Sequence, residues 1–177
     1  MISRHHLDEF MALKRTSDSI QISAVATELA PGVPVFQQID LQLNALDNEV
    51  FVVTMIQLDP DAPDLIAANS TSVDCSVSTT LRTTVGTISN SNVLATSQKQ
   101  IIMNAASVDG CPFQREDPIY TDPFAGNIGI IATSNAFLNV VGLNNGNVKA
   151  VQCRIYGYRA KASSSVYAAL VQSELLS

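Results

Sequence analysis

The chain has two histidines, His5 and His6. They matter for catalysis because many active sites and metal sites depend on an imidazole. Nucleophilic hydrolysis needs an imidazole within hydrogen-bond reach of a serine or cysteine. Both histidines stand side by side near the start of the sequence, on what we expect to be a mobile arm. This position argues against a Ser-His or Cys-His hydrolase and against histidine-based zinc or iron sites.

A group of aspartates in the stretch DPDAPD is spaced so that one loop presents several carboxylates to a hard cation: Asp59, Asp61 and Asp64. Calcium takes about six to eight oxygen ligands, and this loop lacks the spacing and the glycine of an EF-hand. Asp117 and Asp122, in a later loop, would have to complete the site. Calcium binding is therefore a weak candidate, and the preferred interpretation is a solvated acidic turn in which Pro60 and Pro63 fix the backbone.

Basic and aromatic residues alternate in the stretch VQCRIYGYRAKA, which contains Arg154, Tyr156, Tyr158, Arg159 and Lys161. Such a strand face can stack single-stranded bases, but arginine and tyrosine are also enriched at subunit interfaces. The net charge of -6 and the pI of about 4.7 argue against a general nucleic-acid binder. We therefore favour a subunit contact or a solvated face, with a nucleic-acid contact as the weaker alternative.

Other site types find little support. Sugar-binding sites rely on aromatic platforms, and the chain has no Trp, so a glycosidase is disfavoured and a lectin-like module stays a minor alternative. The glycines are scattered rather than gathered in a phosphate-binding loop. The cysteines, Cys75, Cys111 and Cys153, form no close pair, so we expect buried thiols and neither disulfides nor a zinc site. We expect no cofactor and no enzymatic activity.

The elements that would position these residues are mostly strands. Charged residues make up only 15% of the chain, against about 25% in typical proteins, and Ser, Thr and Asn are abundant. Apolar and polar residues alternate over 20–24, 39–43 and 75–81, which is the period of a half-buried strand. The run 50–58 is almost continuously apolar and β-branched, as in a central strand buried on both faces, and we expect it to pair with the preceding strand.

Further strands are expected around 98–106, 128–132 and 137–141, and a long irregular segment over 107–127. Asn145-Gly146 lies between two apolar runs and predicts a type I′ hairpin turn joining 137–141 to a last strand at 148–160. In that strand Val151, Cys153 and Ile155 would face the core.

Helical spacing appears only at the two ends of the sequence. Residues 3–15 predict a short helix whose apolar side is formed by Leu7, Phe10 and Met11. Residues 164–176 predict a second helix, and its apolar side includes Tyr167 and Leu170. Isolated short helices are marginal in water, so both apolar sides need a partner surface. We regard them as candidate subunit contacts.

This order of elements predicts an all-β protein, an antiparallel β-sandwich, as a single jelly roll of about eight strands. An immunoglobulin-like sandwich is the nearest alternative, but the chain lacks its Cys…Trp…Cys pattern. The predicted organisation is an N-terminal arm or helix over 1–18, a sandwich domain over 19–162, and a C-terminal helix over 163–177 packed on the sandwich or on a neighbour.

In this architecture the chain resembles the single jelly-roll capsid proteins of small icosahedral viruses. The features concerned are the leading arm MISRHHLDEFMALKRTSD, the alternating strands from Ser19, the long loop over 107–127 and the closing strand VQCRIYGYRAKA. The arm is not strongly basic, unlike the commonest arms of that family. The resemblance implies a subunit that assembles into a shell and has no catalytic activity.

We therefore expect a self-assembling structural protein of a virion whose partners are copies of itself and other virion proteins. The alternative is a decoration, fibre or receptor- or glycan-binding module. The start MISRHHLDEF lacks the apolar core of a signal peptide, and no stretch approaches the roughly 18 apolar residues of a membrane span. We expect synthesis in the host cytoplasm.

Overall fold

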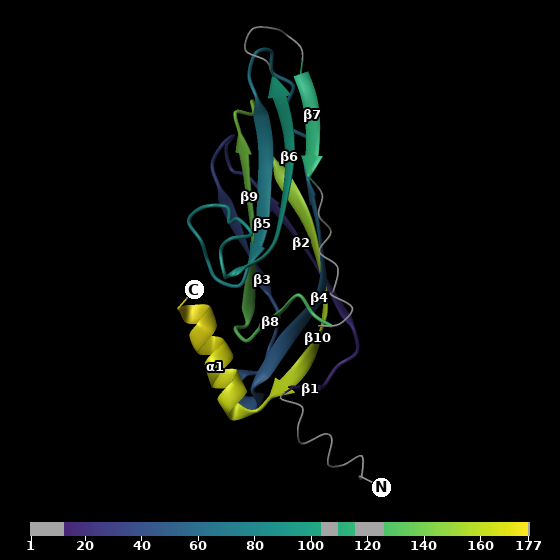
Figure 1. Cartoon of the computed structure of the whole chain (residues 1–177), viewed down its shortest axis with the longest axis vertical. Helices are drawn as coiled ribbons and strands as arrows, with labels where there is room; N and C mark the ends of the chain where they lie inside the picture. Colours follow the sequence, from purple (N-terminus) through teal and green to yellow (C-terminus); the bar gives the residue numbers. More distant parts are fainter. Residues whose placement is uncertain (1–12, 104–109, 116–125, 177) are drawn as a thin grey trace.

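The structure is a computed structural model that describes residues 13–103, 110–115 and 126–176. Its ten strands form two antiparallel sheets (Figure 1). Sheet A contains β1 (Leu13–Arg15), β2 (Ile20–Thr27), β10 (Ala150–Ala162), β4 (Glu49–Pro60) and β8 (Gly129–Ile131). Sheet B contains β3 (Val35–Asp40), β9 (Asn135–Leu143), β5 (Thr71–Ser78), β6 (Val93–Met103) and β7 (Gly110–Arg115). A short 3-10 helix, η2 (Ala45–Asp47), precedes β4, and helix α1 (Ser164–Leu175) follows β10.

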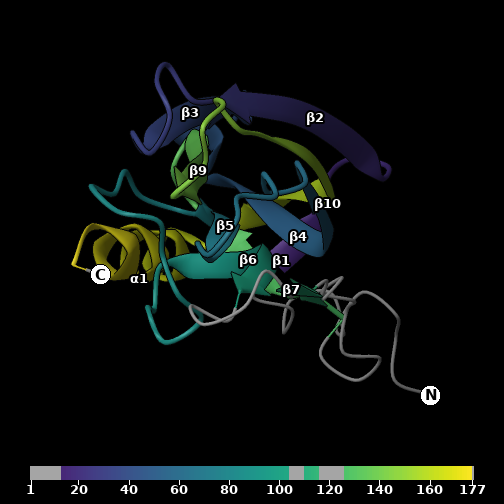
Figure 2. The ribbon, with the colours of Figure 1, turned by 90° about the horizontal axis from the view of Figure 1, so that it is seen from above.

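The strands pair in a nested order that defines a jelly roll. The pairs are β2 with β10, β3 with β9, β4 with β8, and β5 with β6, as in one long hairpin folded back on itself. Two further pairings, β10 with β4 and β9 with β5, roll this hairpin into two sheets. Seen along the long axis, β10 and β4 lie on one side and β9 and β5 on the other (Figure 2). The predicted antiparallel sandwich of jelly-roll type is confirmed.

The main core lies between the sheets, and the alternation along each strand fills it. Sheet B contributes Val73, Cys75 and Val77 from β5, and sheet A contributes residues such as Phe51 and Ile155. All of these side chains are almost completely buried. Val50 and Val52 of β4 point the other way and are also buried, so the prediction of a strand buried on both faces is confirmed.

Helix α1 explains why β4 is buried on its outer face. Its apolar side packs on sheet A, over a cluster formed by Val50, Val52, Ala132, Ala160 and Ala162. The carboxylate of Glu174 accepts hydrogen bonds from the backbone amides of Ala132 (2.7 Å) and Thr133 (3.0 Å). This buried carboxylate fastens the last turn of the helix to the segment between β8 and β9.

The structure corrects three local predictions. Leu13–Arg15 is a strand paired with β10 rather than the end of a helix, and residues 3–12 lie outside the described part. The strand at 39 and the strand at 50 belong to different sheets and do not pair. β9 and β10 also belong to different sheets, so Asn145-Gly146 is no hairpin turn; the residue with positive φ there is Asn144, at 57°.

Two expected boundaries also move. The segment 107–127 is not wholly irregular, because Gly110–Arg115 forms β7 on the outer edge of sheet B. The alternation over 75–81 ends at Ser78 as a strand, and Leu81 is exposed on the segment between β5 and β6.

Candidate functional site

The acidic loop DPDAPD lies at the end of the sandwich where β2, β4 and β9 end, toward the top of Figure 1. Asp64 is its most connected residue. Its Oδ2 accepts hydrogen bonds from the amides of Gly146 and Asn147, each at 2.9 Å, and its Oδ1 from Lys149 Nζ at 2.7 Å. These contacts hold the pKa of Asp64 down to about 2, with the Lys149 bond as the largest cause. The aspartate therefore joins the loop after β4 to the loop before β10.

The other carboxylates at this end of the sandwich also accept hydrogen bonds, two of them from backbone amides. Asp61 Oδ2 accepts from the amide of Ala150 at 2.9 Å, and Asp59 Oδ1 accepts from Lys99 Nζ at 2.8 Å. Glu28, which is buried, accepts from the amides of Gly142 and Lys149, each at 2.8 Å. Nothing in the local sequence around Glu28 indicates this role, because both partners lie more than a hundred residues away.

The structure does not bring Asp59, Asp61 and Asp64 together as a cation site. Each carboxylate faces a different donor. Within 13–103, 110–115 and 126–176, no group of three or more His, Cys, Asp or Glu residues is placed to hold a metal ion. Asp117 and Asp122 lie outside the described residues. The candidate calcium loop is thus a structural clamp in this fold.

The predicted contact residues on β10 divide between two surroundings. Arg154 is exposed on the outer face of sheet A and Tyr156 is half-buried beside it, with Arg154 Nη1 and Tyr156 Oη 3.4 Å apart. Tyr158 instead packs with the cluster beneath α1, and the guanidinium of Arg15 lies 4.4 Å from the centre of its ring. Arg154 and Tyr156 therefore remain available to a partner, whereas Tyr158 is largely used within the chain.

The candidates on the two terminal segments also differ. Tyr167 and Leu170 pack on sheet A of their own chain, as part of the apolar side of α1. Leu7, Phe10 and Met11 lie outside the described residues. In the part of the chain that the structure describes, no helix is long and apolar enough to cross a membrane.

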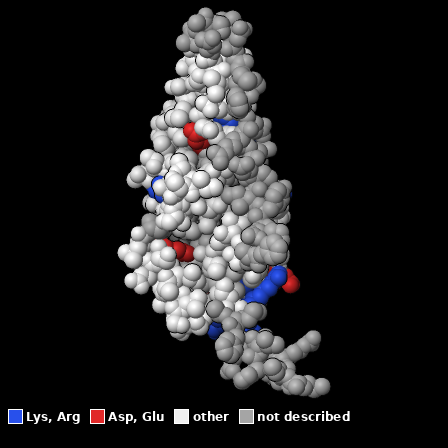
Figure 3. All heavy atoms as spheres, in the orientation of Figure 1, with Lys and Arg blue, Asp and Glu red and all other residues white. Residues whose placement is uncertain are grey.

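Sheet B presents an almost uncharged outer surface, which the overall net charge conceals. Residues 65–98 contain one acid and one base, Asp74 and Arg82, and residues 126–148 contain neither. On sheet B these two stretches supply β5, β9, β6 up to Gln98 and the segment over 79–92, and they also supply β8 of sheet A. On this side the space-filling view shows a few isolated charged side chains on a neutral surface (Figure 3). Charge counted segment by segment would have indicated this face.

The 79–92 segment folds back over sheet B and is held there by polar contacts. The amide of Gly86 donates to Ser76 Oγ at 3.0 Å, and Asn139 Nδ2 donates to Ser76 Oγ at 3.2 Å and to Ser78 Oγ at 3.1 Å. Ser76, Ser78 and Asn139 are fully buried, although they point away from the main core. The alternation in the sequence predicts that these polar residues face solvent. In the structure, the 79–92 segment covers them.

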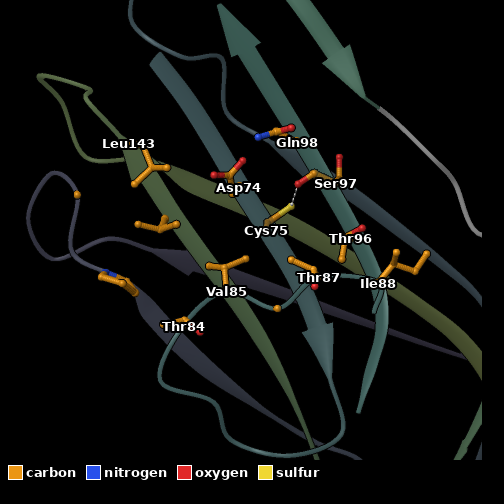
Figure 4. A pocket seen from close by; sticks show the side chains of 14 residues that line it. Asp74, Cys75, Thr84, Val85, Thr87, Ile88, Thr96, Ser97, Gln98 and Leu143 are labelled. Atoms are coloured by element: carbon orange, nitrogen blue, oxygen red, sulfur yellow. Dashed lines mark hydrogen bonds between the residues drawn. The ribbon is translucent and has the colours of Figure 1, made fainter. Parts of the chain in front are cut away.

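A cavity of about 540 Å³ lies between this segment and the outer faces of β5, β6 and β9 (Figure 4). Its apolar lining includes Val85, Ile88, Val141 and Leu143. Asp74 is the charged residue of the lining, and burial raises its pKa, an effect that the side chains of Gln98 and Ser72 partly offset. The two oxygens of Asp74 differ: Oδ2 accepts from Ser72 Oγ at 3.2 Å, whereas the buried Oδ1 has no hydrogen-bond partner among the described residues.

The described cysteines belong to the core. Cys75 and Cys153 face the inter-sheet core and are buried, so the predicted burial of both thiols is confirmed. Burial raises the pKa of each thiol to about 12. A thiol with such a pKa is a poor nucleophile at neutral pH. Cys111 belongs to β7, where only the backbone is described.

Comparison with known proteins adds little to this geometry. No protein-family model matches the chain, and no curated protein matches it. Among solved structures, the chain is similar to one titled Desmodium yellow mottle tymovirus, with 10% sequence identity and a TM-score of 0.28, over 83% of this chain and 91% of that one. A TM-score of this size does not establish a common fold, so the jelly-roll architecture stands on the strand pairing of the chain itself.

Proposed function

We propose that the protein is a structural subunit that assembles with copies of itself into a shell, the capsid of a virion. The observation that carries the proposal is the neutral outer surface of sheet B, on a jelly-roll sandwich. The centre of a protein interface is depleted of charged residues, whereas the exposed surface of a soluble monomer is usually rich in them. Residues 65–98 and 126–148 hold only one acid and one base, so this face matches the first pattern.

The rigidity of this face supports association. The 79–92 segment is anchored at Gly86 by Ser76, and at Asn92 by Arg82 Nη1, whose bond to Asn92 Oδ1 is 2.6 Å long. A segment that is already ordered loses less conformational entropy when a partner docks on it. Exposed apolar side chains also occur at the end of the sandwich where Asp64 joins two loops: Leu29, Val33, Leu65 and Val148. They give a second surface on which water would be displaced by a neighbouring copy.

The outer face of sheet A and the N-terminal arm complete the proposed contacts. Arg154 and Tyr156 would meet a neighbouring subunit, because the acidic balance of the chain disfavours nucleic acid at this face. The apolar side chains of Leu7, Phe10 and Met11 would be buried against a second copy. A shell component of this kind requires no catalytic group.

The test compares two matched charge insertions. Leu81 is exposed on the 79–92 segment, and Leu46 is exposed on η2, which belongs to none of the proposed contact surfaces. We expect the native protein to form shells or large rings in light scattering and negative-stain micrographs. Leu81→Asp should reduce their size or abolish them, whereas Leu46→Asp should leave them intact.

A monomer that stays monomeric at every concentration would contradict the proposal. Equal effects of the two substitutions would show that sheet B is not the contact face. A discrete trimer that binds glycans would support the decoration or receptor-binding alternative instead.

A further inference from the structure

The cavity beside Asp74 contains an unmet hydrogen-bond acceptor. Asp74 Oδ1 is shielded from solvent and has no hydrogen-bond partner among the described residues. Leaving a buried acceptor unpaired is costly, and native structures pair nearly all such groups. Gln98 lies opposite Asp74 in the register of β5 and β6, and a hydrogen bond from its side chain to the carboxylate lowers the pKa of Asp74. Within the described part of the chain, Oδ1 is nevertheless left without a donor.

The surroundings of this oxygen restrict what the donor can be. Val85 and Ile88 line the cavity from the 79–92 segment, and Leu143 lines it from β9 (Figure 4). Val141 of β9 also lines it. Among the side chains that the structure describes, no Lys or Arg lines the cavity. The volume of about 540 Å³ lies within the range of small-molecule sites, roughly 300–1,000 Å³.

We propose that this cavity binds a small molecule with an apolar body and one protonated amine, the amine donating to the carboxylate of Asp74 and the body packing on Val85, Ile88 and Val141. The charge and the shape of the site act together. An ammonium group supplies both a donor and a positive charge, so attraction between opposite charges adds to the hydrogen bond with the carboxylate. An alcohol supplies only the donor, and a carboxylate would place like charges side by side.

The cavity belongs to one chain and needs no second copy. The inference therefore does not depend on shell assembly, and an assembly-defective variant such as Leu81→Asp should keep the site.

The test uses three probes of the same shape: 1-naphthylmethylamine, 1-naphthalenemethanol and 1-naphthoate. Naphthalene fluorescence anisotropy reports binding, and the chain has no Trp to interfere. We expect the amine to bind at least about tenfold more tightly than the alcohol, because only the amine adds the attraction of opposite charges to its hydrogen bond. We expect 1-naphthoate to bind most weakly. Binding of the amine should also weaken as the pH falls, because protonation of Asp74 removes its charge.

Two variants and one control variant test whether the probes bind in the cavity beside Asp74. Asp74→Asn should bring the affinity for the amine down to that for the alcohol, while Asp18→Asn, an exposed aspartate next to sheet A, should change nothing. Thr96→Phe, which fills part of the cavity from β6, should reduce binding of all three probes. Equal affinities of the native protein for amine and alcohol would overturn the proposal, and so would the absence of saturable binding. The probe comparison needs no variant, so a misfolded variant does not prevent a decision.

Discussion

Gly157 stands at a point of close approach inside sheet A. The register between β10 and β4 shifts between Tyr156 and Gly157, and a Cβ at 157 would collide with the backbone oxygen of Val52 and approach Cζ of Phe51 to 2.8 Å. Glycine is the residue that allows one backbone to come this close to another at a bulge.

We therefore expect Gly157→Ala to lower the free energy of unfolding by about 1–3 kcal/mol, the usual cost of overpacking a core. Gly146 serves as the matched control. The nearest atom to a Cβ there is Asp64 Oδ2 at 3.8 Å, and the residue has no positive φ, so Gly146→Ala should change stability by less than about 0.5 kcal/mol. Urea unfolding measures both, and equal midpoints would contradict the account of Gly157.

Asp64 should make the stability of the folded protein decline in acid. Its pKa falls from an ordinary value of 3.8 to about 2 in the folded chain, so the folded state holds the carboxylate charged where the unfolded chain would protonate it. The stabilisation is fully present above pH 4 and is lost as the pH falls through about 2. Asp64→Asn should therefore flatten the decline of the melting temperature between pH 4 and pH 2. In Asp18→Asn the melting temperature should fall with pH as steeply as in the native protein. An equally steep fall in Asp64→Asn would show that the Asp64 carboxylate does not stabilise the fold.

At the scale of elements, helix α1 depends on one buried carboxylate. Glu174 joins the helix to the backbone amides of Ala132 and Thr133. Glu174→Ala leaves two donors without their acceptor, which costs about 1–3 kcal/mol for each buried group left unpaired. We expect a large fall in the urea midpoint, partial recovery in Glu174→Gln, and no change in Gln172→Ala, which is exposed on the same helix. Similar midpoints for Glu174→Ala and Gln172→Ala would show that the helix docks through its apolar side alone.

Elements with a strong internal period could be predicted from the sequence. The alternation of β2 and β10 and the apolar run of β4 appear at nearly the expected positions, because burial on one or two faces leaves a local pattern. β1 could not be found this way, since three residues are too few for a period and the strand exists through its pairing with β10.

The predicted hairpin turn at Asn145-Gly146 is wrong for a related reason. Its conformation is set by distant groups: Asn145 donates to the carbonyl of Ser72 at 2.8 Å, and the amide of Gly146 donates to Asp64. A dipeptide preference cannot anticipate contacts across some seventy to eighty residues of chain. The cavity beside Asp74 escaped prediction in the same way, because it exists only when the 79–92 segment lies on sheet B.

At the scale of the whole molecule, the arm offers a test of assembly that leaves the sandwich intact. β1 begins at Leu13, and Ser17 Oγ accepts from the amide of Arg159 at 2.8 Å, so a cut before residue 13 keeps these contacts. Removal of 1–12 should preserve the circular dichroism spectrum and the melting temperature but give a smaller assembly in light scattering.

A full-length variant with Leu7, Phe10 and Met11 all changed to Ser should behave like the truncated chain, which separates the apolar contact from the loss of length. Full-size assemblies from both proteins would show that the arm makes no contact with a neighbour. Loss of folding in both would assign the apolar side of the arm to the core of its own chain.

The nested pairing has a kinetic consequence. β5 and β6 are separated by only the 79–92 segment, whereas Ile20 of β2 pairs with Gly157 of β10 across most of the chain. Contacts so distant in sequence form late and slowly, with folding times of milliseconds to seconds for β-sandwiches. Until β10 arrives, β4 has no partner along most of its length, and its run VFVVTMIQL is an uncovered aggregation-prone strand. A fragment ending before residue 150 would therefore precipitate or remain bound to chaperones.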